Sequence, residues 1–267
     1  MDFSVPPDSK TARLPRALRP LAVVVLRGYL ELRALVRREP PPPYVFEADG
    51  LATVHYSPFL EDDAFSASYD EMAREWFVHA KVDVRWRMWL LTRFARHCRD
   101  LDGEYAEFGT YRAGCAFMML ATSGLPASKR LYLFDTFAGF PLEMLNDAER
   151  AAGLHGALAD TSVEYVEARL GRWKDQVVIV AGDVFDTLAR TETGPLAFVH
   201  MDLNLSKPTV VALEYAYPRL TSGAIVVFDD YGGAGLEAQR VVVDKFFADK
   251  PEEVVALPSG QGMMIKR

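Results

Sequence analysis

Two apolar segments of the sequence end in carboxylates. Residues 195–201 are followed by Asp202, and residues 224–228 are followed by Asp229 and Asp230. Adjacent buried carboxylates repel one another and lose their hydration, so a compensating partner is needed. If the two segments are neighbouring parallel strands, the three acids meet at the carboxyl edge of a sheet, where α/β folds bind ligands. We therefore predict a site for Mg2+ or a similar hard cation. The alternative is that amide or arginine side chains cap these acids.

These acids belong to an alternation of strand-type and helix-type segments. Strands are predicted at residues 104–109, 131–136, 177–181, 198–202 and 224–229. Helices are predicted at residues 115–123, 163–173, 209–220 and 236–248. The alternation predicts an α/β fold, a mostly parallel sheet with helices on both faces. Two short strands at residues 253–257 and 263–266 follow, and the tight turn between them requires antiparallel pairing.

The first three predicted strands end in residues suited to a nucleoside. Glu107 and Gly109 end the first strand, Asp135 ends the second, and residues 182–184 follow the third. An acid at the end of the second strand is placed to accept hydrogen bonds from a ribose diol, and the third strand end would border an adenine ring. Neither a Walker loop nor the three-glycine dinucleotide signature is present, which disfavours a phosphate-bearing nucleotide and a dehydrogenase.

The composition excludes some classes of protein. The chain has 267 residues, of which 50% are hydrophobic and 25% charged, and its net charge is −7. This acidic balance disfavours nucleic-acid binding, which needs a basic face. The two cysteines, Cys98 and Cys115, form no disulfide framework and fit the reducing cytoplasm.

The first 43 residues differ from the rest. They contain eight Lys or Arg and four acids around the apolar residues 21–26, a stretch too short to span a bilayer. A basic amphipathic helix and a proline spacer are predicted here. The helix either packs on its own domain or across a homo-oligomer, or lies on a partner or the inner membrane surface. Residues 44–100, whose acids and aromatics predict two helices, are expected to form a lid, and residues 101–267 the α/β domain.

Several motifs in this order carry a resemblance to a known family. They lie at residues 53–55, 107–114, 134–141, 182–188, 201–202, 217–220 and 229–232. From about residue 50 to the end, the chain resembles the macrocin O-methyltransferase (TylF-type) family of class I S-adenosylmethionine methyltransferases. The resemblance implies a Rossmann-like core of seven strands with an antiparallel last strand. It also implies bound S-adenosyl-L-methionine, bound Mg2+ and methyl transfer to a hydroxyl group.

The resemblance also implies roles for individual residues. Asp202, Asp229 and Asp230 match the metal ligands. The cofactor would be bordered by Glu107, Gly109, Thr110, Tyr111, Asp135, Thr136, Phe137, Gly182, Asp183 and Val184. The family usually has a second acid, thought to act as general base, two residues after the first metal aspartate. Asn204 stands at this place, and an amide takes up no proton at neutral pH.

The catalytic group is therefore expected among His200, Asn204 and Asp202. His200 precedes Asp202 by two residues, so strand alternation points both side chains to the same side of the sheet. The alternative is a core histidine that is hydrogen-bonded within the sheet. His55 and His155, on segments that could cover the site, are further candidates.

Together these observations predict a Mg2+-dependent S-adenosylmethionine O-methyltransferase. Its partner would be a small hydroxyl-bearing acceptor, a sugar, a glycoside or a related natural product. The absence of the expected base keeps a second hypothesis open. In that hypothesis the fold binds the cofactor or a metal without turnover and serves as a scaffold.

Overall fold

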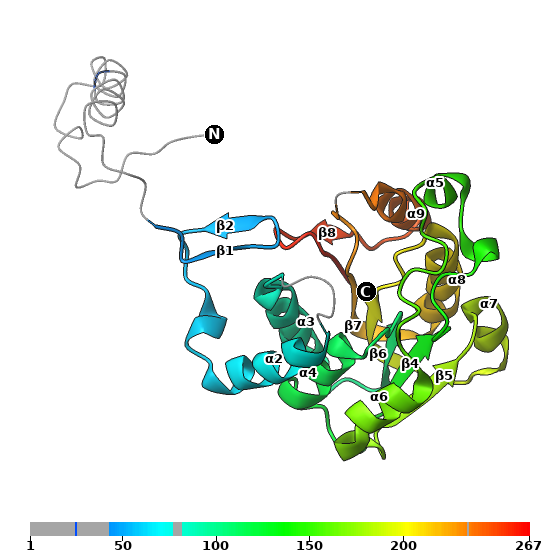
Figure 1. Ribbon diagram of the computed structural model, residues 1–267, viewed down its shortest axis with the longest axis horizontal. Helices are drawn as coiled ribbons and strands as arrows, with labels where there is room; N and C mark the ends of the chain where they lie inside the picture. Colours follow the sequence, from blue (N-terminus) through cyan, green and yellow to red (C-terminus); the bar gives the residue numbers. More distant parts are fainter. Residues whose placement is uncertain (1–24, 26–42, 77–81, 234) are drawn as a thin grey trace. The chain divides into compact units, whose positions relative to one another are not determined.

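Seven strands form a sheet in the order β5-β4-β3-β6-β7-β9-β8 (Figure 1). The computed structural model describes Val25 and residues 43–76, 82–233 and 235–267. The strands are β3 (Glu104–Phe108), β4 (Leu131–Asp135), β5 (Val177–Ala181), β6 (Leu196–Met201), β7 (Leu220–Phe228), β8 (Val255–Ala256) and β9 (Gly262–Ile265). Strands β3 to β7 pair in parallel, whereas β9 is antiparallel to β7 and β8. The predicted α/β sheet with an antiparallel last strand is confirmed.

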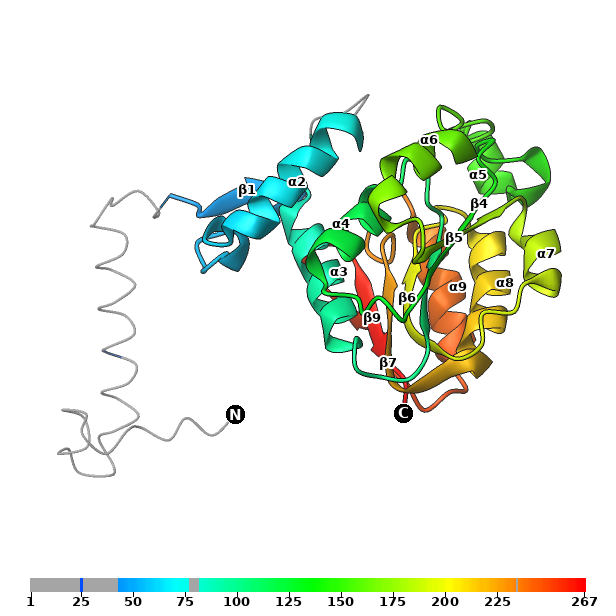
Figure 2. The ribbon, with the colours of Figure 1, turned by 90° about the horizontal axis from the view of Figure 1, so that it is seen from below.

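The central strands are apolar because helices cover both faces of the sheet. Every residue of β6 is buried, as expected for an interior strand of a parallel sheet. One face carries α3 (Arg85–His97), α4 (Gly114–Thr122) and α6 (Val163–Arg169), and the other carries α7 (Val184–Thr187), α8 (Ser206–Ala216) and α9 (Glu237–Phe247) (Figure 2). Each face has its own cluster of buried apolar side chains.

Residues 44–100 add a hairpin and two helices to the first face. The hairpin joins β1 (Phe46–Ala48) to β2 (Leu51–Thr53), and α2 (Asp63–Trp76) precedes α3. The two helices agree with the sequence prediction, which lacked the hairpin. The aromatic rings of Phe59 and Phe65 are buried in the same cluster as Phe117 on α4. These aromatics therefore belong to the core.

The chain from Tyr44 to Arg267 forms one compact unit. Apart from Val25 and Pro43, the basic arm predicted at the amino end lies outside the described residues. The division of the chain after residues 43 and 100 stays a prediction. Among the helices of the described residues, none has both the length and the apolar character to cross a membrane.

The segment between β4 and α6, here called the insertion, is fixed to the start of α8 by a buried glutamate. Glu149, on α5 (Asp147–Ala151), accepts hydrogen bonds from the backbone N–H and the hydroxyl of Ser206 at 2.8 and 2.9 Å. Glu149 and Asn146 also cap α5 reciprocally. These contacts hold the insertion over the carboxyl edge of the sheet.

Candidate active site

Strand register brings the predicted site residues to one edge of the sheet. Phe108, Met201 and Phe228 are aligned across β3, β6 and β7. Beyond them the ladder continues, because the N–H of Asp202 donates to the carbonyl of Phe108 at 2.8 Å and the N–H of Asp229 donates to that of Met201 at 2.9 Å. The residues that follow these three strands therefore lie side by side.

A cavity of about 380 Å³ opens along this edge, a size typical of small-molecule sites. Its lining combines backbone turns and acids with apolar side chains. The lining residues are Arg87, Gly109, Thr110, Tyr111, Cys115, Asp135, Thr136, Gly139, Phe140, Met144, Leu158, Gly182, Val184, Asp202, Leu203, Asn204, Leu205, Pro208, Asp229 and Asp230.

The turn between β3 and α4 is sharply bent. Gly109 has φ +88°, and a Cβ at this position would lie 1.8 Å from the carbonyl oxygen of Asp202. The glycine is thus required by the approach of β6, whereas the sequence pattern had indicated the approach of a ligand. Tyr111 and Ala113 also have positive φ, at 48° and 57°. Left-handed residues other than glycine are strained and occur often at functional sites.

Asp135 holds this strained turn in place. One of its oxygens, Oδ2, accepts the N–H groups of Thr110 and Tyr111 at 2.8 and 2.7 Å, and Oδ1 accepts the N–H of Phe137 at 2.7 Å. A carboxylate offers about four lone-pair positions, so one remains for a further donor. The predicted ribose contact is compatible with this arrangement, and the loop-holding role is one that sequence reasoning missed.

The predicted cofactor residues divide into two groups. Gly109, Thr110, Tyr111, Asp135, Thr136, Gly182 and Val184 line the cavity, whereas Glu107, Phe137 and Asp183 do not. Glu107 is fully buried, and Asp183 caps α7 by accepting the N–H of Phe185 at 2.8 Å.

An unpaired buried hydroxyl supports the fit to a cofactor. Among the described residues, Glu107 Oε2 and Thr110 Oγ1 have no hydrogen-bonding partner at normal distance, although the two side chains lie close enough to influence each other. Buried polar atoms are normally paired, so the hydroxyl of Thr110, which lines the cavity, is suited to a polar ligand, whereas Glu107 does not reach the cavity. Apolar side chains such as Val184 and Leu158 lie in the same cavity and suit a nucleobase.

The three predicted metal ligands converge at the other end of the cavity. Carboxylate oxygens of Asp202, Asp229 and Asp230 lie within 4.8 Å of one another. Burial and the neighbouring carboxylates raise the pKa of Asp202 well above its ordinary value and that of Asp230 to about 7. The protein alone therefore disfavours the ionised forms of Asp202 and Asp230, which a bound cation would stabilise, and an all-oxygen set of this kind fits a hard cation such as Mg2+.

Asn204 joins two of these acids. Its backbone N–H donates to Asp230 Oδ2 at 3.1 Å, and its side-chain amide donates to Asp202 Oδ1 at 3.3 Å. The residue has φ +56°, a conformation that asparagine tolerates better than most residues. In this structure Asn204 orients acids and accepts no proton.

Asp229 differs from its two neighbours because the guanidinium of Arg87 contacts it. Arg87 Nη1 lies 3.1 Å from Asp229 Oδ2, and the amide of Gln261 donates to Asp229 Oδ1 at 2.8 Å. Despite burial, these contacts and His200 hold the pKa of Asp229 below its ordinary value. The capping considered as an alternative is therefore present at Asp229 through both an arginine and an amide, whereas at Asp202 it is provided by the amide of Asn204. Arg87 and Gln261 were missed by sequence reasoning.

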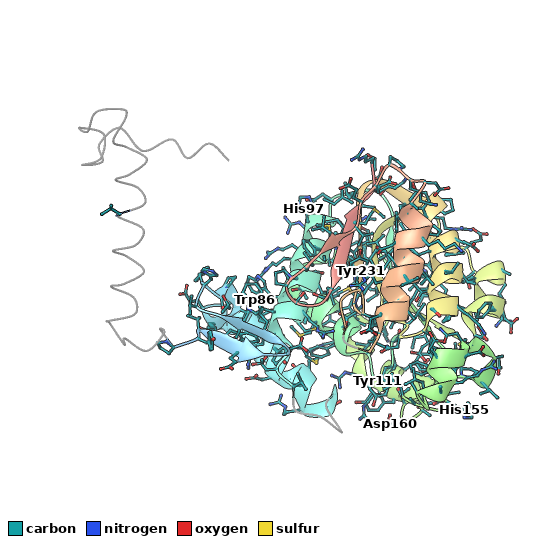
Figure 3. All side chains as sticks on the ribbon, turned by 90° about the horizontal axis from the view of Figure 1, so that it is seen from above. Trp86, His97, Tyr111, His155, Asp160 and Tyr231 are labelled. Atoms are coloured by element: carbon teal, nitrogen blue, oxygen red, sulfur yellow. The ribbon has the colours of Figure 1, made fainter. Side chains whose placement is uncertain are left out.

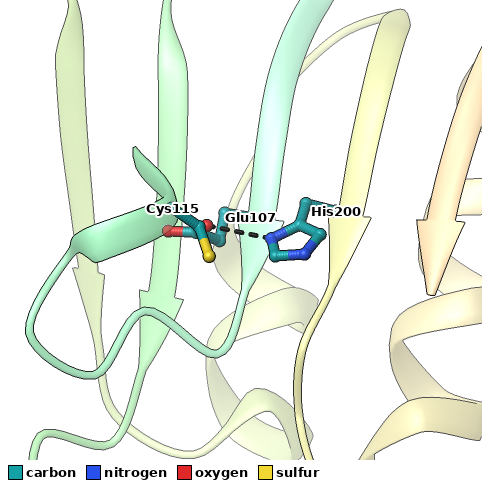
Figure 4. Close-up of side chains that lie close together, drawn as sticks. All are labelled: Glu107, Cys115 and His200. Atoms are coloured by element: carbon teal, nitrogen blue, oxygen red, sulfur yellow. Dashed lines mark hydrogen bonds and ion pairs between the residues drawn. The ribbon is translucent and has the colours of Figure 1, made fainter. Parts of the chain in front are cut away.

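His200 is enclosed between two carboxylates, of which Figure 4 shows Glu107. Its Nδ1 lies 3.0 Å from Glu107 Oε1, and its Nε2 lies 3.7 Å from Asp229 Oδ1. Burial disfavours the imidazolium, but the two carboxylates raise the pKa of His200 to about 10. The ring is fully buried and does not line the cavity, which favours an internal hydrogen-bonded histidine over a base that reaches substrate. Cys115 Sγ completes this cluster.

The other two candidate histidines lie apart from the cavity lining. His55 and His155 are both exposed, and His155 lies on the insertion (Figure 3). Nearer the turn after β3, the hydroxyl of Tyr111 donates to Asp160 Oδ1 at 2.8 Å. This bond joins the end of the insertion to the turn that Asp135 holds.

Comparisons with known proteins agree with the motifs. A sequence profile of the macrocin-O-methyltransferase (TylF) family matches residues 61–252. The chain is 33% identical over 140 residues to 8-demethyl-8-(2,3-dimethoxy-alpha-L-rhamnosyl)-tetracenomycin-C 4'-O-methyltransferase of Streptomyces olivaceus, with 49% of this chain and 54% of that protein covered. It is 30% identical over 155 residues to mycinamicin III 3''-O-methyltransferase of Micromonospora griseorubida, with 51% and 60% covered. The matches thus span little more than half the length of these relatives.

Solved structures show the same fold. The O-methyltransferase NovP superposes with a TM-score of 0.64 at 20% identity, over 76% of this chain and 99% of that one. Calicheamicin methyltransferase CalS11 gives 0.59 at 22% identity, over 79% and 94%. An O-methyltransferase from Bacillus cereus, solved in complex with SAH, gives 0.52 at 13% identity, over 78% and 96%. At these identities the likeness concerns the fold alone.

Proposed function

The chain belongs to the macrocin-O-methyltransferase (TylF) family, and we propose that it is a Mg2+-dependent, S-adenosylmethionine-dependent O-methyltransferase. The observation that carries this proposal is the placement of the cavity. Its one end is formed by the turns after β3, β4 and β5, and its other end by the acids after β6 and β7. A cofactor and a cation bound at these two ends would be neighbours.

For the acceptor, we propose a hydroxyl group of a sugar, a glycoside or a related natural product. Two relatives are named as 4'-O- and 3''-O-methyltransferases of rhamnosyl-tetracenomycin and mycinamicin compounds. The cavity of this chain agrees with a polar acceptor, because Asp202, Asn204 and Asp230 present oxygen and amide groups at the acidic end. Groups of this kind accept and donate hydrogen bonds to a diol.

The residues of the chain would act mainly by positioning. When bound, S-adenosylmethionine supplies an electrophilic methyl group, and Mg2+ polarises the acceptor hydroxyl. Asp135 fixes the turn at Thr110 and Tyr111 that borders the cofactor end. Asp202 and Asp230 would hold the acceptor end, oriented by Asn204. Fixed geometry of this kind accounts for much of the rate enhancement in transfer reactions.

The acceptor proton requires a separate path. Methyl transfer breaks the carbon–sulfur bond, forms a carbon–oxygen bond and releases the hydroxyl proton. Asn204 cannot take this proton, and the imidazole of His200 is fully buried with its Nε2 turned toward Asp229. We therefore assign proton removal to water in the cavity, and we assign His200 to the support of Asp229.

The test is formation of S-adenosylhomocysteine with a panel of deoxysugar glycosides, free sugars and phenols, with and without a chelator. We expect turnover with a glycoside, loss of turnover on chelation and recovery with Mg2+. Full turnover in chelator would contradict the metal proposal. Cofactor binding without product on any acceptor would favour the scaffold hypothesis, which the replacement of the usual base by Asn204 keeps open.

A further inference from the structure

Arg87 places a protein cation at the candidate metal site. Its side chain extends from the first turn of α3 into the cavity, where it lies 3.1 Å from Asp229 Oδ2. Its side chain is 22% exposed, and that of Asp229 is 16% exposed. An ion pair at this burial is screened less than a surface pair, so it competes measurably with any other cation at the same carboxylate.

The same guanidinium holds a second carboxylate. Arg87 Nε and Nη2 donate to the two oxygens of Asp49 at 2.5 and 3.1 Å. This is the bidentate fork that arginine forms best with a carboxylate. Arg87 therefore has one complete partner in Asp49 and one shared partner in Asp229.

Asp49 is held independently of the acidic cluster. It forms the two-residue turn of the β1–β2 hairpin with Gly50, and these residues have φ 51° and 73°. Positive φ at both positions is the pattern of a type I′ hairpin turn. Because the turn fixes the Asp49 backbone, its carboxylate stays available to Arg87 even when Asp229 binds another cation.

We propose that Arg87 is a built-in competitor of the metal, bound to Asp229 when the metal is absent and retained by Asp49 when a divalent cation binds. This inference rests on the proposed Mg2+ site. A cation of charge +2 at the three acids repels the guanidinium, and the energy of such a contact in a half-buried site is large compared with thermal energy. Asp49 lowers the cost of releasing Asp229, so Asp49 and Arg87 have opposite effects on metal affinity.

The experiment is isothermal titration calorimetry of the full chain with MgCl2 in the presence of S-adenosylhomocysteine. Arg87→Met removes the competitor, and we expect Mg2+ to bind roughly tenfold more tightly than to wild type. Asp49→Asn leaves Asp229 as the remaining charged partner of Arg87, and we expect binding to weaken roughly threefold to tenfold. Neither expectation depends on turnover.

Arg85→Met is the matched control. Arg85 lies on the same helix, two residues before Arg87, and pairs with Asp70 and Asp83 instead of the acidic cluster. Its removal deletes the same charge, and we expect the Mg2+ affinity to stay within about twofold of wild type. An equal gain in Arg85→Met and Arg87→Met would reduce the effect to net charge and overturn the proposal.

The outcomes separate the two levels of the proposal. Mg2+ binding that is unchanged or weaker in Arg87→Met overturns the competitor role and leaves the metal site intact. Binding to Arg87→Met alone, with none to wild type, supports strong competition. No binding to wild type or to any variant overturns the metal site itself. If Arg87→Met does not fold, Asp49→Asn carries the test, and unchanged or tighter binding there is the contrary result.

Discussion

Two regions of this protein bury carboxylates in opposite ways. Glu252, between α9 and β8, is 2% exposed and accepts hydrogen bonds from Tyr217, Lys266 and the N–H of Arg267 at 2.7, 2.8 and 3.2 Å. Although burial alone would raise the pKa of Glu252, these donors lower it to about 2. At the cavity, burial and repulsion raise the pKa of Asp230 to about 7.

The difference separates structural acids from acids arranged for a ligand. A carboxylate that has its full set of donors stabilises the fold and needs nothing from outside. Carboxylates that repel one another at the wall of a cavity destabilise the fold until a cation arrives. Asp229 is intermediate, because Arg87 and Gln261 already contact its oxygens. Burial alone would not have distinguished these cases.

The largest expected effect is on turnover. Asp202→Asn removes one charged oxygen from the proposed cation site, and metal charge stabilisation is worth several kcal/mol, so we expect a loss of roughly 10³-fold in kcat. Glu252→Gln is the control, with the kcat of its folded fraction expected within about twofold of wild type. Initial rates of S-adenosylhomocysteine formation measure both. An Asp202→Asn variant with more than a tenth of wild-type activity would erase the distinction between the two regions.

The second effect is on stability, and here the larger change is expected at Glu252 and not at Asp202. Glu252→Gln weakens charge-assisted bonds and leaves Lys266 without its carboxylate, so we expect the free energy of unfolding to fall by about 2 kcal/mol. Urea denaturation at neutral pH, without Mg2+, measures it. Asp202→Asn should show no such loss under the same conditions. Equal losses in the two variants would mean that both acids are structural.

The sequence was informative where a local pattern had one structural meaning. Apolar runs ending in Asp202 and in Asp229–Asp230 indicated strands, and parallel pairing then placed the acids together. Strand alternation also predicted that the side chains of His200 and Asp202 point to the same side of the sheet. The partner of His200 could not be predicted in this way, because Glu107 comes from a neighbouring strand 93 residues away.

Contacts between distant segments were not readable. Arg87 lies 142 residues from Asp229, and nothing local distinguishes it from Arg85 on the same helix. The β1–β2 hairpin was missed by the sequence prediction for a different reason. Asp49 and Gly50 are a known two-residue turn pair, but the flanking strands are three residues each and too short to show a period of two.

A third prediction reverses the usual cost of changing a buried polar residue. Asp230→Asn keeps the oxygen that accepts the N–H of Asn204 and removes a charge near Asp202 and Asp229. We expect the metal-free protein at pH 8 to gain about 1 kcal/mol in its free energy of unfolding. Urea denaturation with chelator measures the gain. With saturating Mg2+ the gain should shrink or change sign, and a variant that is less stable than wild type in chelator would contradict the repulsion.

The smallest effect is a pair of opposite pH slopes. The pKa of Asp230 is raised from 3.8 to about 7, so its folded state holds the proton more tightly, and stability falls as the pH rises through that window. The pKa of Glu252 is lowered from 4.5 to about 2, so its contribution to stability is complete above pH 4.5 and is lost as the pH falls toward 2.

For metal-free wild type we expect slopes of roughly 0.5 kcal/mol per pH unit on each side, below the single-group limit of about 1.4 kcal/mol per pH unit. Denaturation midpoints between pH 2.5 and 8 measure both limbs. The raised pKa values of Asp202 and His200 contribute to the upper limb in the same direction. Asp230→Asn should therefore reduce the slope of the upper limb without abolishing it, and Glu252→Gln should reduce the lower limb. A variant that changed the other limb instead would show that the two regions are not electrostatically separate.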